Sequence, residues 1–237
     1  MEFTLDKFLG NKISLKQSVK GLRATSDSDL GSALVPVKKN ETVLDIGAGN
    51  GIIGCCCQAR TTCQVTAIEI QKGLCSLIQE NAALNNKKIE IIQHNILSSK
   101  DPLKGRLFNH IVTNPPFYEK SQKMRQNMEQ RQAYVQEFDF KKWLNYGLKH
   151  LRAKGSFNLI HRPEKLPEIL SILTEKLGNI DVFPIVSKEG EAANRILVRG
   201  YLNKKGPLTL HFPLIMHTKD NQRTQTAEKI LRLGERI

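Results

Sequence analysis

The fold of this 237-residue chain is decided by the stretch Thr42-Val43-Leu44-Asp45-Ile46-Gly47-Ala48-Gly49-Asn50-Gly51. It reads as a short apolar strand that runs into a glycine-rich turn, and the residues after it predict a helix. Glycines let the backbone turn sharply and approach a ligand closely. The amides at a helix start carry partial positive charge, which suits an anionic group. The stretch therefore predicts a nucleoside cofactor at this turn.

Short apolar runs and amphipathic segments alternate outward from this turn, which is the pattern of strands and helices around a parallel sheet. The predicted strands are residues 42–46, 64–70, 88–93, 109–113, 156–161, 180–187 and 195–202. The predicted helices are residues 51–60, 71–84, 138–151 and 164–176. Residues 1–39, the polar residues 118–136 and the tail from residue 203 fall outside the pattern.

The spacing of an acidic residue after the glycines leaves two kinds of nucleoside cofactor open. Residues 49–54 also fit the dinucleotide pattern G-x-G-x-x-G, and Glu69 stands about 20 residues further on, as that pattern requires. For either cofactor Glu69 ends the second strand of the series, where its carboxylate can accept hydrogen bonds from both ribose hydroxyls. The alternative is a surface glutamate that contacts no ligand.

A second motif, Asn114-Pro115-Pro116-Phe117, directly follows the strand predicted at 109–113, at the edge where open α/β sheets hold ligands. The exocyclic amine of a purine is a poor nucleophile because its lone pair is delocalised into the ring. Two acceptors, the Asn114 side-chain oxygen and the Pro115 carbonyl, would favour a pyramidal nitrogen with its lone pair directed at a methyl group. The prolines hold the backbone extended, and Phe117 offers a face on which an extruded base can stack.

This motif predicts transfer of a methyl group from S-adenosylmethionine to an amino nitrogen. Positioning would carry most of the catalysis, and no metal is expected. Together with Asp45, two residues before the first glycine, it favours a methyltransferase over a nicotinamide oxidoreductase. The structural alternative is a proline-rich turn with an exposed phenylalanine.

Composition bounds the partners and the surroundings of the chain. Lys and Arg number 36 against 23 Asp and Glu, and this net charge of +13 favours a polyanion such as nucleic acid as partner. No signal peptide and no membrane span are recognised in the sequence, so a cytoplasmic protein is expected. A monomer is also expected. Five cysteines without ligand spacing predict neither disulfides nor a metal site. The triplet 55–57 is expected to pack on a buried helix face.

With these residues in hand, the chain resembles the bacterial tRNA1(Val) adenine-N6 methyltransferase family over nearly its whole length. Beyond the two general motifs, residues 21–27 look like that family's segment before the sheet, and residues 159–163 and 195–199 look like its later strands. The resemblance implies a Rossmann-like, seven-stranded class I methyltransferase sheet that is mostly parallel, with an antiparallel last strand and helices on both faces. It also implies an N-terminal segment, 1–39, packed near the cleft, and a methyltransferase domain, 40–237.

The resemblance further assigns roles to individual residues. The cofactor contacts would come from Asp45, Gly47, Gly49, Gly51 and Glu69, with Arg23 and Asp27 near the pocket. Residues 114–117 would hold the target adenine, in the anticodon loop of tRNA(Val). Where the third strand normally ends in an Asp that meets the cofactor adenine, this chain has Asn95, whose carbonyl can still accept from the adenine amino group.

RNA contacts are expected from the basic residues of the long loop and from the strand end at 161–162. The residues concerned are Lys120, Lys123, Arg125, Arg131 and Arg162. For His161 a structural role is favoured over a phosphate contact. The alternatives to a tRNA adenine are another RNA, a protein glutamine, whose amide poses the same weak-nucleophile problem, and a non-catalytic RNA-binding module of the same fold.

Overall fold

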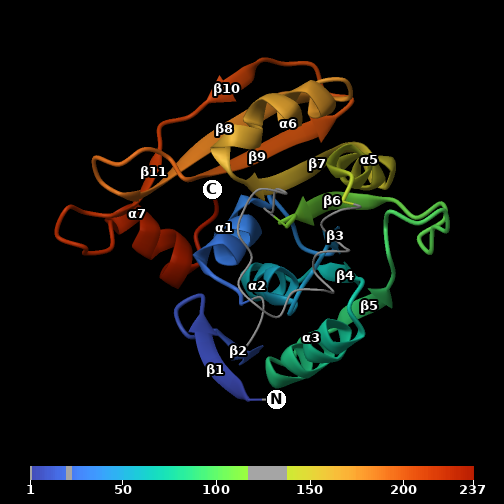
Figure 1. The fold of residues 1–237 in the computed structure, drawn as a ribbon, viewed down its shortest axis with the longest axis horizontal. Helices are drawn as coiled ribbons and strands as arrows, with labels where there is room; N and C mark the ends of the chain where they lie inside the picture. Colours follow the sequence, from blue (N-terminus) through green and yellow to red (C-terminus); the bar gives the residue numbers. More distant parts are fainter. Residues whose placement is uncertain (1, 20–22, 117–137) are drawn as a thin grey trace.

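A nine-stranded sheet forms the centre of the computed structural model, which describes residues 2–19, 23–116 and 138–237 (Figure 1). Its strands, in chain order, are β3 Thr42–Ile46, β4 Gln64–Glu69, β5 Ile89–Gln93, β6 Phe108–Thr113, β7 Leu151–His161, β8 Leu177–Lys188, β9 Arg195–Leu202, β10 Leu208–Leu210 and β11 Leu214–His217. In space they follow the order β10-β8-β9-β7-β6-β3-β4-β5, and β11 also pairs with β8.

Seven of these strands make the predicted class I methyltransferase sheet. Strands β5, β4, β3, β6 and β7 are parallel to one another. Strand β9, the last of the seven in the chain, inserts between β7 and β8 and is antiparallel to both. The mostly parallel sheet with an antiparallel last strand is therefore confirmed. The short strands β10 and β11, which the sequence did not predict, extend the sheet alongside β8.

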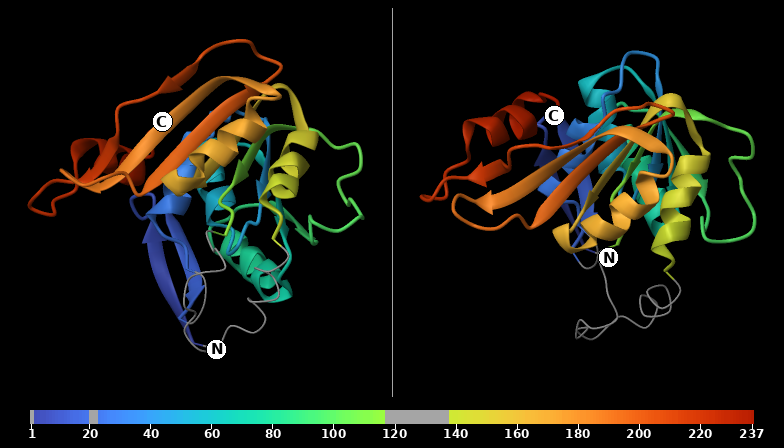
Figure 2. Two further views of the ribbon diagram at one scale, coloured as in Figure 1. Left: turned by 45° about the horizontal axis from the view of Figure 1, so that its top comes forward. Right: turned by 90° about the horizontal axis from the view of Figure 1, so that it is seen from above.

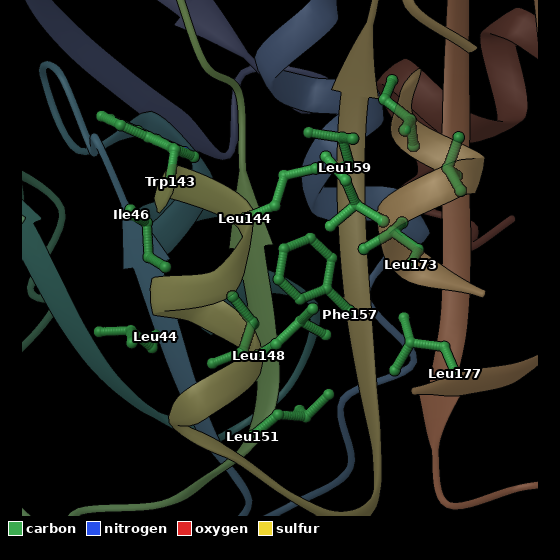
Figure 3. Close-up of a cluster of buried hydrophobic side chains, with 14 of the residues drawn as sticks. Leu44, Ile46, Trp143, Leu144, Leu148, Leu151, Phe157, Leu159, Leu173 and Leu177 are labelled. Atoms are coloured by element: carbon green, nitrogen blue, oxygen red, sulfur yellow. The ribbon is translucent and has the colours of Figure 1, made fainter. Parts of the chain in front are cut away.

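Helices cover both faces of the sheet, as predicted (Figure 2). The first face carries α1 Ser26–Leu34, α2 Ile52–Arg60 and α3 Lys72–Leu84. The second carries α5 Phe140–Lys149 and α6 Leu166–Leu173, which follows a single 3-10 turn at Pro163–Lys165. Because alternate side chains of a strand point to opposite faces, Val43 joins the α2 core while Leu44 and Ile46 join the α5 core. Figure 3 shows this second core, with Phe157 at its centre.

The cysteine triplet packs as predicted. Cys55, Cys56 and Cys57 lie on α2 and are fully buried among apolar side chains of the first face. Burial raises the pKa of Cys55 to about 12 and the pKa of Cys56 and Cys57 well above the ordinary thiol value. These thiols therefore act as small apolar side chains.

Most predicted elements match the structure within a few residues, but β7 begins five residues before the predicted strand. The added residues, Leu151 to Gly155, contain a bulge in which Lys154 has a φ of 64°, and the pairing with β6 shifts register there. Three of these side chains are exposed and interrupt the apolar pattern on which the prediction depended.

Residues before β3, which the sequence left unassigned, form a hairpin and helix α1. Strands β1 Phe3–Phe8 and β2 Ile13–Ser18 pair with each other, and α1 begins after Thr25, whose hydroxyl caps it. An amide ladder docks the hairpin on α3. Asn81 exchanges hydrogen bonds with the backbone N–H and C=O of Lys16, and Asn85 does the same with Ser14, at 2.7–3.1 Å. Two helix side chains thus take the place of a neighbouring strand.

The chain closes with α7 Gln225–Glu228 and a π-helical turn at Lys229–Leu233, which pack with α1 on the first face of the sheet. None of the helices in the described ranges combines the length and the apolar character that crossing a membrane requires.

Candidate active site

Three of the predicted site segments leave the sheet at one edge. Ile46, the last residue of β3, pairs with Ile68 of β4 on one side and with Thr113 of β6 on the other. Because these strands are parallel, their carboxyl ends point the same way. The glycine turn, Glu69 and Asn114 therefore start side by side at the edge where open α/β sheets bind ligands.

The backbone of the glycine turn has a conformation that residues with a side chain rarely adopt. Gly47, Gly49 and Gly51 have φ values of 71°, 57° and 83°, in the left-handed region that glycine adopts most readily. A Cβ on Gly49 would meet no described atom within 4 Å, whereas one on Gly51 would meet Ile78 at 3.0 Å. The backbone at Gly49 therefore borders open space that a ligand can enter, while Gly51 is held against α3.

The carboxylate of Asp45 is buried and lacks a hydrogen-bond donor in the described structure. Asp45 is 1% exposed, and neither oxygen has a hydrogen-bond partner among the described residues. Burial is the main cause that raises the pKa of Asp45 to about 7, and the nearby Glu69 carboxylate adds to the rise. The Gly54 amide opposes the rise without reaching hydrogen-bonding geometry. Such a group is suited to a cationic partner.

Glu69 ties the second strand to the glycine turn. Its Oε2 accepts a hydrogen bond from the Gly49 amide at 3.0 Å, and its Oε1 accepts from the amides of Ile70 and Gln71 at 2.9 Å each. Burial raises its pKa, and these three amides oppose the rise. A carboxylate has about four acceptor positions, so Glu69 keeps capacity for a further donor such as a ribose hydroxyl.

The Asn-Pro-Pro segment presents a second unsatisfied acceptor at the same edge. The Asn114 Oδ1 is buried and has no hydrogen-bond partner in residues 2–19, 23–116 and 138–237. Pro115 is buried and Pro116 half-buried. The prediction that Phe117 stacks on a base falls outside the described residues. An acceptor without a donor is costly in a protein interior, and a bound amine would relieve that cost.

Arg23 and Asp27 are both engaged by other side chains. Arg23 contacts the Asp6 carboxylate of the hairpin and donates to Thr4 Oγ1 at 2.9 Å. Asp27 Oδ2 accepts from Arg195 Nε at 2.8 Å. Asn95 lies just beyond β5 and is exposed, and its Oδ1 accepts from the Leu97 amide at 3.0 Å. The cofactor roles of these three residues remain predictions.

Gln17 connects the hairpin to the glycine turn, a contact that sequence reasoning missed. Its Oε1 accepts from Asn50 Nδ2 at 2.9 Å, and its Nε2 donates to Asp6, the partner of Arg23. Asn81, in the amide ladder, also donates to the Asn50 carbonyl at 3.0 Å. The alternation of Ile13, Leu15 and Gln17 is the only local signal of this strand, and it does not reveal its partner.

The predicted RNA contacts are only partly within the described residues. Lys120, Lys123, Arg125 and Arg131 lie outside them. Arg162 follows β7 at the site edge and is half-buried. His161 is buried, its ring centroid lies 5.2 Å from that of Phe140, and burial lowers its pKa to about 4. Burial and the lowered pKa favour a structural role for His161, which stays a prediction.

No group of three or more His, Cys, Asp or Glu side chains in the described parts of the chain is arranged to hold a metal ion. The polar groups that the structure does place at the site are the acceptors of Asp45, Glu69 and Asn114 around the glycine turn.

Comparison with known proteins decides the family. Residues 18–186 match the model of the methyltransferase small domain family. The chain belongs to this family. The S-adenosylmethionine-dependent methyltransferase predicted from the sequence is thereby confirmed, and S-adenosylmethionine is the cofactor. The nicotinamide alternative has no support.

Curated relatives of this methyltransferase are similar over most of their length. A protein named tRNA1(Val) (adenine(37)-N6)-methyltransferase from Shewanella halifaxensis is 29% identical, with 76% of this chain and 75% of that protein covered. A protein of the same name from Haemophilus influenzae is 23% identical, with 95% and 97% covered.

Solved structures share the fold. A predicted O-methyltransferase from Agrobacterium tumefaciens superposes with a TM-score of 0.69 at 24% identity, over 86% of this chain and 94% of that one. A 16S rRNA methyltransferase from T. thermophilus, solved with AdoMet and guanosine, gives 0.57 at 17% identity, over 85% of this chain and 50% of that one.

Cofactor binding is expected to depend on pH through Asp45. With a pKa of about 7 in the free protein, its carboxyl is mostly protonated at pH 6 and mostly ionised at pH 7.5. Since the ionised form attracts a cationic ligand, the Kd for S-adenosylmethionine should fall several-fold, up to about tenfold, over this range, with release of a proton. Calorimetry in buffers of different ionisation enthalpy measures both effects.

The matched variant is Asp45→Asn, which keeps the shape of the side chain. Its Kd should be weaker at pH 7.5 and nearly independent of pH. A pH slope as steep as that of the wild type would show that another group is responsible. In the free wild-type protein the raised pKa acts in the opposite sense: the contribution of Asp45 to the free energy of unfolding should decline as pH rises from about 4 to 7, which the difference between wild type and Asp45→Asn measures.

Proposed function

We propose that this methyltransferase modifies N6 of an adenine in tRNA, namely the anticodon-loop adenine of tRNA(Val). The observation that carries the proposal is the buried, unpartnered Oδ1 of Asn114, one strand away from the glycine turn. An acceptor at that place fits an amine that must be oriented for attack.

The residues around the glycine turn fit the cofactor. Asp45 offers an unpartnered carboxylate to a cationic group, Gly49 borders open space, and Glu69 retains acceptor capacity for a ribose. When bound, S-adenosylmethionine supplies an electrophilic methyl group on a sulfonium. We propose Asp45, Gly47, Gly49, Gly51 and Glu69 as the residues that hold it. The hairpin contact to Asn50 supports the prediction that segment 1–39 packs near this site.

On the acceptor side, Asn114 and Pro115 would orient the amino group. The Asn114 Oδ1 and the Pro115 carbonyl each accept a hydrogen bond from the amine, which draws its lone pair out of conjugation with the ring. The nitrogen would then bond to the methyl carbon as the bond from that carbon to the sulfonium sulfur breaks, which would leave a neutral thioether, and the extra proton on nitrogen would go to solvent. This reaction requires no general base. Asp45, on the neighbouring strand and with a raised pKa, is therefore not assigned that role.

The choice of substrate is supported by charge and by the relatives. A net charge of +13 favours a polyanion over a protein glutamine. The curated relatives are named tRNA1(Val) (adenine(37)-N6)-methyltransferases, at 23–29% identity. The adenine that is modified is identified by locating the methyl group in the product RNA.

The test is a methylation assay with labelled S-adenosylmethionine and total tRNA from a strain that lacks the enzyme. We expect label in one tRNA, tRNA(Val), at the N6 of an anticodon-loop adenine, identified by nuclease digestion and mass spectrometry. Label in another RNA would redirect the proposal to that substrate. Methylation of a protein glutamine, with none of RNA, would overturn it.

A further inference from the structure

Trp143 contacts both halves of the candidate site. It lies in the first turn of α5, 3% exposed, after Asp139, which caps the helix. Its indole Nε1 donates a hydrogen bond to Thr113 Oγ1 at 2.9 Å, and the Thr113 hydroxyl donates to the Ile46 carbonyl at 2.9 Å. Thr113 directly precedes Asn114, and Ile46 directly precedes Gly47. One chain of hydrogen bonds therefore joins the residues from which the two site segments depart.

The ring of Trp143 also packs against the glycine turn itself. A Cβ on Gly47 would lie 2.8 Å from Trp143 Cζ2 and 2.9 Å from Cη2, so the six-membered part of the indole fills the place of that side chain. Figure 3 shows Trp143 next to Ile46 on the same face of the sheet. The ring of Phe138 also lies near the indole, 5.2 Å away between centroids and tilted by 55°.

We infer that Trp143, through Thr113, is a positioning residue that sets the separation between the cofactor turn and the amine-binding segment. The inference rests on the proposed function, since it assigns Asn114 to the amine. Methyl transfer needs the nitrogen and the methyl carbon at close, aligned approach, and a misplacement of about 1 Å costs on the order of 10²-fold in rate. A buried hydrogen-bonded pair restrains such a shift, because a broken bond would leave two polar groups unsatisfied.

The sharpest kinetic test compares Thr113→Val with Thr113→Ser. Valine keeps the shape of threonine and loses the hydroxyl, whereas serine keeps the hydroxyl. We expect Thr113→Val and Trp143→Phe to lower kcat by about 10- to 100-fold with the Kd for S-adenosylmethionine changed less than about threefold. Thr113→Ser should recover most of kcat. The loss in the double variant should be smaller than the product of the two single losses, because both substitutions remove the hydrogen bond between Trp143 and Thr113.

The control is Leu148→Val, a buried substitution in the same helix and the same core. It should lower the melting temperature and leave kcat unchanged. If Thr113→Val and Thr113→Ser have the same kcat, or if Trp143→Phe, like the control, lowers the melting temperature and leaves kcat unchanged, Trp143 only supports the fold and the inference is wrong.

A second readout needs no tRNA. Trp143 is the single tryptophan of the chain, so its indole N–H gives one resonance in an NMR spectrum. Saturation with S-adenosylhomocysteine should shift that resonance in the wild type, and its exchange with water should be at least tenfold faster in Thr113→Val than in Thr113→Ser. Failure to methylate tRNA would refute the proposed function alone. The role of Trp143 would be refuted if the indole resonance did not shift with S-adenosylhomocysteine and if its N–H exchanged with water at the same rate in both variants.

Discussion

Replacing Asn114 with alanine is expected to lower the rate of methyl transfer by roughly 10²-fold or more while the enzyme still binds its cofactor. The reason is that the Asn114 side-chain oxygen is a buried acceptor without a partner among the described residues. The reacting amine can donate a hydrogen bond to it. The loss of one preorganised polar contact of this kind costs about 10²–10³-fold in kcat. Single-turnover assays on tRNA, paired with calorimetric titration of S-adenosylmethionine, measure both quantities.

Asn194→Ala is the matched control for Asn114→Ala. Asn194 is an exposed asparagine just before β9, at the same edge of the sheet, and its amide donates to Ser187 Oγ at 2.6 Å. Its removal should leave the single-turnover rate within about twofold of the wild type, as for most surface substitutions. Equal rates for the two alanine variants would count against the assignment of Asn114 to the amine.

Replacing Arg60 with alanine is expected to lower the free energy of unfolding by about 3–5 kcal/mol, the cost of leaving one member of a buried ion pair alone. The Arg60 side chain is 1% exposed and contacts Asp29 Oδ1 at 2.8 Å. Burial already raises the pKa of Asp29 to about 6, and Arg60 opposes the rise. Without Arg60 the pKa must rise further, so the deficit should be larger at pH 7.5 than at pH 5.5.

Urea denaturation at the two pH values measures the free energy of unfolding, and two further variants serve as controls. Lys16→Ala breaks the exposed pair with Glu80 and should cost no more than about 1 kcal/mol. Arg60→Met combined with Asp29→Asn removes both charges and should recover much of the lost stability. A loss for Arg60→Ala no larger than that for Lys16→Ala would mean that Asp29 is not buried as the structure has it.

Much of the sheet could be predicted because its strands are buried on both faces. The ends of β3 and β9 agree with the predicted residues 42–46 and 195–202, since continuous apolar runs end at polar turns. The hairpin, α1 and the strands after residue 202 were not predicted. The side chains of the hairpin alternate with partial exposure, β10 is exposed throughout, and α1 buries mostly small and polar side chains. Such strands depend on tertiary partners, which leave little trace in local sequence.

The candidate site divides in the same way. Asp45, Glu69 and Asn114 could be placed at one edge because each lies at or within one residue of the end of a parallel strand, and topology alone brings those ends together. The engagement of Arg23 by Asp6 could not be predicted, because it depends on where the hairpin docks. Trp143 was also missed: it lies 30 residues after Thr113, and nothing in the sequence between them indicates the hydrogen bond.

The amide ladder on α3 also occupies one strand edge of the hairpin. An uncovered strand edge is a template on which a second chain can add its own strand. Along β2 that template is already occupied at Ser14 and Lys16 by the amides of Asn85 and Asn81. A helix side chain cannot be extended into a further strand, so the row of bonds stops there. That edge of β2 is thereby capped against fibril-like growth by groups that belong to its own fold.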